Sequence, residues 1–304
     1  MQFLAAYIMK GRMQAMTVAS TLALLSLLFP PVSIVSSATV ALVTLRQGGK
    51  EGLYVLLFGS LAAAVLSILL LGGYQFALLY GLVLWMPIWV IAVILREGGQ
   101  MAVAVEIAVL LGILAVAGFY WYQPEPAQVW RGVLGVMIEQ MSQAQPDAPL
   151  EMMKSSAERF AHFMTGAIAA GSVYSLLFGL FLARWLQAKL YNPGGFRQEY
   201  LALRGHKLLA VVTLLDIAVA LLAGGGPAAE LCWNMLIVLF ALYTFVGTAV
   251  LHCSFASMKG SRFMVPILYI TLLAIPHIMV LVAICGLGDT WLNLRNKLKP
   301  KNGV

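Results

Sequence analysis

The sequence contains little charge. Only 10% of its 304 residues are Asp, Glu, Lys or Arg, whereas 62% are apolar or aromatic. Soluble domains are about half apolar and about a quarter charged. A chain of this size cannot hide so much apolar surface in one core, so a soluble globular protein is excluded, and the apolar content also excludes intrinsic disorder. The composition indicates a polytopic α-helical protein of the lipid bilayer.

Paired cysteines and catalytic motifs are also missing. Cys232, Cys253 and Cys285 have no CxxC spacing, which speaks against a disulfide framework or a zinc site. No HExxH or GxSxG motif occurs, and the glycine doublets do not form a GxGxxG or Walker sequence. We therefore predict no metal site, no cofactor and no enzymatic activity.

The charge that is present lies mainly in short turns. Lys and Arg outnumber Asp and Glu by 19 to 12, and five basic residues fall within 184–207. The turns at 72–75 and 224–230 contain no Lys or Arg. This asymmetry is what the positive-inside rule requires, so it predicts orientation rather than nucleic-acid binding. We expect the basic turns and the N-terminus to be cytoplasmic.

Nine apolar runs are candidates for membrane segments, and we predict an all-α bundle of eight or nine of them. Most contain the roughly 20 apolar residues that a helix needs to cross a bilayer. Run 32–45 is short, and two prolines interrupt 264–286, so whether these two cross fully stays open. The runs are 13–29, 32–45, 53–71, 76–95, 101–121, 161–183, 208–223, 231–252 and 264–286.

The C-terminal tail disagrees with nine full crossings. Nine crossings place the tail opposite the basic turns, yet it contains Arg295, Lys297, Lys299 and Lys301. Three explanations stay open: 264–286 is re-entrant, an early run does not cross, or the tail breaks the positive-inside rule.

The polar insertion 122–160 separates the fifth run from the sixth. Six of its apolar residues recur at the spacing of one helical face, which predicts an amphipathic helix on the outer surface. This helix is either an interfacial anchor or a lid over the mouth of the bundle. The six residues are Trp130, Val133, Leu134, Met137, Ile138 and Met141.

Polar and ionisable residues inside the runs are the best pointers to a binding site. A charged side chain at the bilayer centre costs about 3 kcal/mol unless it is paired or hydrated. Glu106, Asp216, Asn234 and His277 all lie within apolar runs. We predict that they contribute to substrate binding. Asp216 and His277 are either a proton-sensitive pair or two separate groups.

Small residues recur at every fourth position of the first run, at Ala15, Ala19 and Ala23. Such stripes let helix backbones approach closely, because lipid gives no hydrophobic drive for helix association. The stripe either packs the bundle internally or docks another membrane protein.

Four features of the sequence occur together: the first run closing on Pro30 and Pro31, the turn 46–52, the insertion 122–160 and the ending 288–295. Together they resemble the YybS-like family of uncharacterised bacterial membrane proteins. The resemblance implies a bacterial cytoplasmic (inner) membrane protein. The family-like C-terminal motif consists of Gly286, Asp289, Trp291 and Arg295. Trp291 and Arg295 are expected to anchor the ending at the headgroups or to recognise a partner.

The first six runs are in turn similar to the S components of energy-coupling-factor vitamin transporters. In those proteins an alanine stripe on the first helix docks a coupling subunit. The resemblance implies an S-component-like region 1–207, including the outer loop 122–160, followed by a three-segment extension 208–304. It implies capture or transport of a small solute with a separate ATPase module. The alternative is a non-transporting scaffold or assembly factor that holds another membrane protein.

Overall fold

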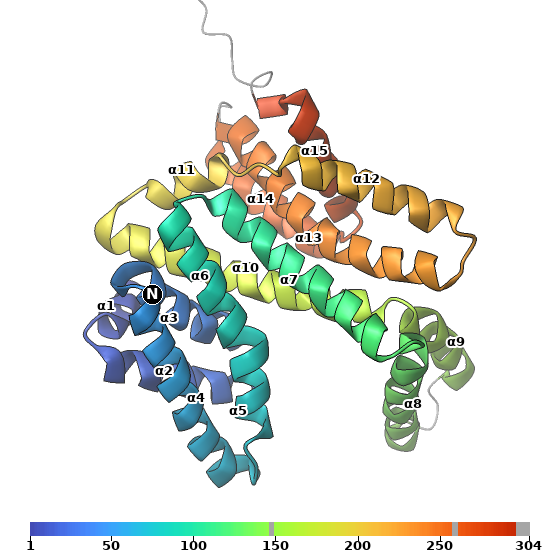
Figure 1. Ribbon diagram of the computed structural model, residues 1–304, viewed down its shortest axis with the longest axis horizontal. Coiled ribbons are helices and arrows are strands. Elements are labelled where there is room, and N and C mark those ends of the chain that lie inside the picture. The colour runs from blue at the N-terminus through green and yellow to red at the C-terminus, as the bar shows by residue number, and fades with distance from the viewer. Residues whose placement is uncertain (146–148, 257–260, 296–304) are drawn as a thin grey trace, which may run out of the picture.

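A computed structural model describes residues 1–145, 149–256 and 261–295. Every regular element in those ranges is a helix, as Figure 1 shows, which confirms the all-α prediction. The elements are α1 (Gln2–Ile8), α2 (Arg12–Leu25), α3 (Val32–Gln47), α4 (Gly49–Leu71), α5 (Gln75–Tyr80), η1 (Gly81–Trp85), α6 (Met86–Gly98), α7 (Met101–Tyr122), α8 (Pro126–Ala144), α9 (Leu150–Ala161), α10 (Met164–Tyr191), α11 (Gly195–Leu201), α12 (Lys207–Leu222), α13 (Pro227–Ala256), α14 (Ser261–Ala274) and α15 (Ile278–Leu292).

Five helices of the described chain are long and apolar enough to cross a membrane. They are α4, the continuous segment α5–η1–α6, α7, α10 and α13. The other apolar helices are shorter: α3 and α12 each have 16 residues. At about 1.5 Å per residue these reach about 24 Å, less than the roughly 30 Å of hydrocarbon. A helical protein with several apolar spans is therefore established, but nine full crossings are not.

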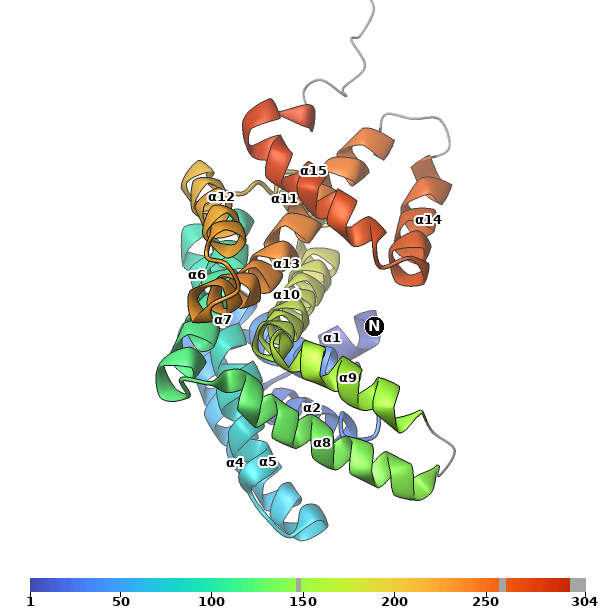
Figure 2. The ribbon, with the colours of Figure 1, turned by 90° about the vertical axis from the view of Figure 1, so that its right-hand side faces the viewer.

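Helices α7 and α10 lie between the two ends of the chain. Figures 1 and 2 show them between the blue N-terminal helices and the orange and red C-terminal ones. Helix α10 packs against α3 on one side and α13 on the other, and α13 also packs against α7. The predicted boundary after residue 207 falls at the start of α12. The segments before and after this boundary pack against each other where α13 contacts α10 and α7.

The small-residue stripe of the first run lies inside the chain. Ala15, Ala19 and Ala23 have no exposed surface. Helix α2 packs there against α3 and α4, and the Ser36 hydroxyl of α3 donates a hydrogen bond of 2.7 Å to the Ala19 carbonyl. The stripe is thus covered by helices of this chain, which leaves it no free surface for docking a partner.

The last apolar run is broken into two helices. Helix α14 ends at Ala274 and α15 begins at Ile278, with Pro276 in the turn between them. The chain thereby returns to the face that carries the 184–207 stretch, where Arg295 donates hydrogen bonds to the carbonyls of Leu201 and Leu203. Run 264–286 is therefore not one continuous crossing. This removes the conflict over the tail as far as Arg295; its three lysines lie outside the described residues.

The polar insertion forms a helical hairpin. Helix α8 confirms the predicted amphipathic helix, and α9 packs beside it. Figure 2 shows the pair projecting from the bundle. Only Pro126 and Ala127 of α8 and Ala161 of α9 are buried, while Met137 is 54% exposed. The hairpin contacts the bundle at its base, where the Trp130 indole N–H of α8 donates a hydrogen bond of 2.8 Å to Thr165, and the choice between an interfacial anchor and a lid stays a prediction.

Candidate functional site

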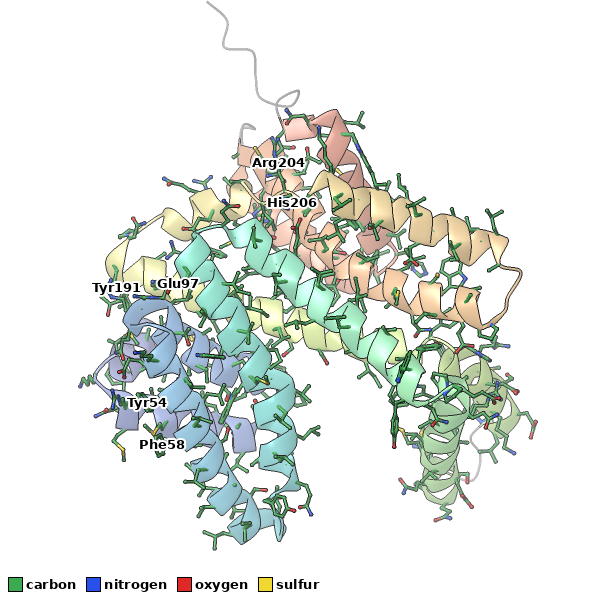
Figure 3. All side chains as sticks on the ribbon, viewed as in Figure 1. Tyr54, Phe58, Glu97, Tyr191, Arg204 and His206 are labelled. Atoms are coloured by element: carbon green, nitrogen blue, oxygen red, sulfur yellow. The ribbon has the colours of Figure 1, made fainter. Side chains whose placement is uncertain are left out.

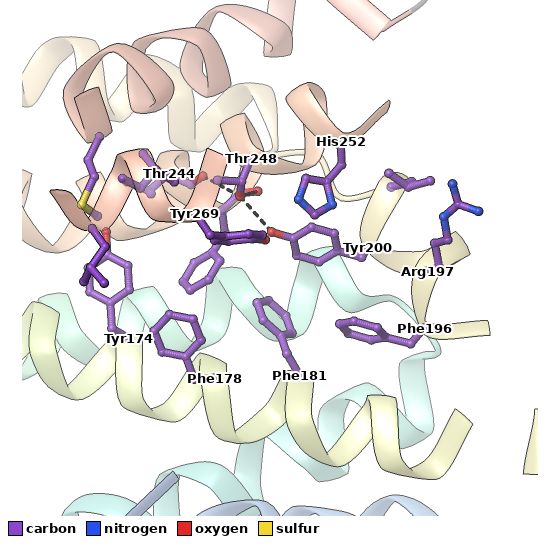
Figure 4. A pocket seen from close by; sticks show the side chains of 15 residues that line it. Tyr174, Phe178, Phe181, Phe196, Arg197, Tyr200, Thr244, Thr248, His252 and Tyr269 are labelled. Carbon is purple, nitrogen blue, oxygen red and sulfur yellow. Dashed lines mark hydrogen bonds between the residues drawn. The ribbon is translucent and has the colours of Figure 1, made fainter. Parts of the chain in front are cut away.

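A cavity of about 510 Å³ lies between α10, α11, α13, α14 and α15. Figure 4 shows its lining side chains, which come from segments far apart in the sequence. The volume is within the range of about 300–1,000 Å³ that small-molecule pockets occupy. The lining residues are Tyr174, Phe178, Phe181, Phe196, Arg197, Tyr200, Leu201, Thr244, Phe245, Thr248, His252, Tyr269, Leu272, Leu273 and Met279.

Aromatic rings form most of the cavity wall. Helix α10 places Tyr174, Phe178 and Phe181 on one face, because residues three or four positions apart are neighbours on a helix. Phe245 of α13 meets Phe178 and Phe181 edge to face, with ring centroids 5.4 and 5.2 Å apart. Phe181 meets Tyr200 in the same way at 5.6 Å. Such a wall favours an apolar or aromatic solute over an ionic one.

Several polar groups lie at one end of the cavity, while Tyr174 and Thr244 are polar lining residues toward the other end. The hydroxyls of Tyr200 and Thr248 are 2.8 Å apart and hydrogen-bonded. Burial raises the pKa of Tyr200, so its hydroxyl stays protonated. Figure 4 shows His252 and Arg197 at the same end. The buried Nε2 atom of His252 has no hydrogen-bond partner in the described structure. Buried polar atoms are nearly always bonded, so this atom lacks a partner that a ligand could supply.

Helix α14 forms a loosely held wall of the cavity. Among its described side chains only Leu268 is buried. Leu273 lines the cavity and is nevertheless 86% exposed. The cavity thus reaches the surface of the molecule at α14, and it also does so at Phe178 of α10, which is 45% exposed. Tyr269 attaches this helix to α13 by an edge contact with His252, at a centroid distance of 5.5 Å.

Of the four residues predicted to bind substrate, Glu106 pairs with the start of α12. Its carboxylate accepts a hydrogen bond of 2.6 Å from the His206 backbone N–H and lies 2.6 Å from His206 Nδ1. Figure 3 shows His206 and Arg204 at this end of the molecule, and Arg204 donates a hydrogen bond of 2.7 Å to Asn293. Glu106 thus joins α7 to α12.

Asn234 belongs to a hydrogen-bond network at the opposite end of α7. Its Oδ1 accepts from the Gly166 N–H at 2.6 Å, and its Nδ2 donates to Tyr120 Oη at 3.0 Å and to the His162 carbonyl at 2.7 Å. Glu230 completes the network, accepting from Tyr120 at 2.8 Å and lying 2.6 Å from His162 Nδ1. Sequence reasoning missed Glu230 and His162, because nothing in their spacing shows that they meet.

Asp216 and His277 do not form the suggested pair. Asp216 lies on α12 with the Cys232 thiol as a neighbour, whereas His277 lies in the turn before α15. No ion pair between them occurs among the described residues. The four predicted residues therefore occupy four separate places, and none of them lines the cavity.

The C-terminal motif residues hold α15 in place. A Cβ atom on Gly286 would lie 2.2 Å from the Tyr243 carbonyl oxygen, so glycine is required where α15 crosses α13. Asp289 and Arg295 form a buried ion pair of 3.1 Å. Burial lowers the pKa of the Arg295 guanidinium, and the Asp289 carboxylate opposes this shift. The expectation that Arg295 points to the headgroups is wrong; only Trp291, 44% exposed, is available to them.

The cavity residues were not predicted, although one signal for them exists. Tyr174, Phe178 and Phe181 recur at helical spacing in α10. That pattern equally suits a lipid-facing surface, and only the fold brings Phe245 and Tyr200 against it.

The described residues contain no cluster of His, Cys, Asp or Glu that could hold a metal ion. Comparison with known proteins finds no matching family model, no similar curated protein and no similar solved structure.

Proposed function

We propose that this protein captures a small, largely apolar solute from the membrane and holds it in the aromatic cavity. The carrying observation is the cavity itself: about 510 Å³ lined mainly by aromatic rings, with Arg197 and His252 at one end. Pockets with mostly apolar walls and a few placed polar groups are the usual form of small-molecule sites.

We propose that the solute enters beside α14. This helix is the least buried wall of the cavity, and Leu273 touches both the cavity and the surface. A solute dissolved in the bilayer could therefore reach Phe181 and Phe245 by displacing one helix, without crossing the rest of the bundle. The sequence contains no nucleotide-binding motif, and we propose that a separate ATPase module supplies the energy for transport. We place the basic face in the cytoplasm, following the positive-inside rule.

The test compares two tryptophan variants of α14. Leu272 lines the cavity, whereas Ile270 on the same helix does not and is 65% exposed. Leu272→Trp fills the cavity, and Ile270→Trp is its matched control. Each protein is extracted gently from its host membrane and analysed by native mass spectrometry. We expect a small molecule on the wild type and on Ile270→Trp, and its loss from Leu272→Trp.

A solute that binds only the folded protein also raises its melting temperature, and it should do so for the wild type and not for Leu272→Trp. Equal solute occupancy in all three proteins would contradict the proposal. Recovery of the chain with another membrane protein, and with no small molecule, would favour the scaffold alternative.

A further inference from the structure

The polar end of the aromatic cavity carries a positive charge without a counter-charge. Arg197 lines the cavity from α11 and is exposed. The nearby charges of Arg184 and Glu199 neutralise each other, because Arg184 donates hydrogen bonds to both carboxylate oxygens of Glu199. Within the part of the chain that the structure describes, no carboxylate pairs with Arg197. A guanidinium at a pocket mouth is well suited to bind a carboxylate or phosphate.

The neighbouring polar atoms can extend this recognition. The Nε2 atom of His252 lacks a partner and lies at the same end as Arg197, while Thr248 and Tyr200 add two hydroxyls there. The lining from Phe181 along α10 is mainly aromatic and ends at Tyr174, whose buried hydroxyl also lacks a hydrogen-bond partner in the described structure. The cavity is therefore amphipathic along its length, with a cationic end and an aromatic body.

We infer that the solute is an amphiphile with an anionic end, whose charge is bound by Arg197 and whose apolar chain lies along Phe178, Phe181 and Phe245. This inference rests on the proposed capture function and adds the chemical class of the ligand. A free fatty acid and an anionic phospholipid of the bilayer share this chemistry. Helix α11 lies at the basic face, so the anionic end meets Arg197 where a headgroup normally lies, and the chain points toward the membrane interior.

The test uses palmitic acid and hexadecanol, two probes with the same chain length and different ends. Binding is measured as thermal stabilisation in nanodiscs of phosphatidylcholine. Arg197→Gln removes the charge, and Lys207→Gln is the matched control, because Lys207 is an exposed basic residue outside the cavity. Leu272→Trp fills the apolar body.

We expect Arg197→Gln to weaken palmitate binding about tenfold and to leave hexadecanol binding unchanged, since it removes one charge-assisted interaction. Lys207→Gln should bind both probes as the wild type does, and Leu272→Trp should lose both. Unchanged hexadecanol binding also shows that Arg197→Gln is folded. Equal palmitate affinity in the wild type and Arg197→Gln would overturn the inference while leaving capture intact.

The outcome for Leu272→Trp separates the two proposals. If it binds both probes as the wild type does, capture in this cavity is wrong, and the anionic-end inference falls with it. Nanodiscs of phosphatidylglycerol distinguish the two ligand sources. If phosphatidylglycerol lowers palmitate binding to the wild type and does not lower it in Arg197→Gln, a phospholipid is the source of the anionic end. Undiminished palmitate binding identifies a free acid.

Discussion

Helices α14 and α15 come from one apolar run, yet they differ in how closely they pack against the rest of the molecule. Helix α15 crosses α13 where Gly247 and Gly286 allow backbone contact, and the Asp289–Arg295 pair fixes its end. Helix α14 buries only Leu268 among its described side chains. Lipid contributes no hydrophobic drive, so a helix is fixed only where close packing or polar bonds hold it. The run therefore encodes one tightly packed helix and one with few buried side chains, and we predict that the second opens more easily.

The largest expected effect is at the anchor of α15. Arg295→Met should lower the free energy of unfolding by about 3 kcal/mol, because it leaves the Asp289 carboxylate buried without its partner. It also removes the bonds to the Leu201 and Leu203 carbonyls. The measurement is thermal unfolding of the purified protein. A variant as stable as the wild type would show that the anchor contributes nothing.

The next effect is at the crossing of α13 and α15. Gly286→Ala should cost about 2 kcal/mol, because its Cβ would collide with the Tyr243 carbonyl and the chain must shift. Gly288→Ala on the same helix is the control, since its Cβ would meet only Leu292 at 3.9 Å. Equal melting temperatures for the two variants would show that the close approach is not required.

A smaller effect compares side chains on the two helices. Val282→Ala on α15 removes a side chain that is 5% exposed and should cost about 1 kcal/mol in lost packing. Leu273→Ala on α14 removes one that is 86% exposed and should change stability by less than about 0.5 kcal/mol. If the two variants lost equal stability, the contrast between anchored and loose helices would be wrong.

The contrast between α14 and α15 also shows how much of the fold the sequence predicts. The apolar runs predicted where helices form, and Pro276 marked 264–286 as the run easiest to break. The basic residues of the tail conflicted with nine crossings, and a re-entrant 264–286 was one of three explanations left open. Helix lengths were less predictable, because α2 ends at Leu25, before Pro30, and α3 begins only at Val32, so neither helix reaches across a bilayer.

The candidate site could not be predicted from single residues. The search for polar residues inside apolar runs selected Glu106 and Asn234, and both are hydrogen-bonded within this chain. The cavity depends instead on Phe181 and Phe245 meeting across α10 and α13, which no local pattern encodes. Polar residues in a membrane segment can thus serve to join helices, and the aromatic residues that enclose a pocket resemble lipid-facing ones.

The most direct test of the account is hydrogen exchange of α14 and α15 in nanodiscs, with and without palmitic acid. Amide exchange reports local opening, which is easiest where few side chains are buried. We predict that α14 exchanges faster than α15, that palmitic acid slows α14 alone, and that Leu272→Trp abolishes this slowing. Equal exchange of the two helices, or an α14 that does not respond to the acid, would contradict the account.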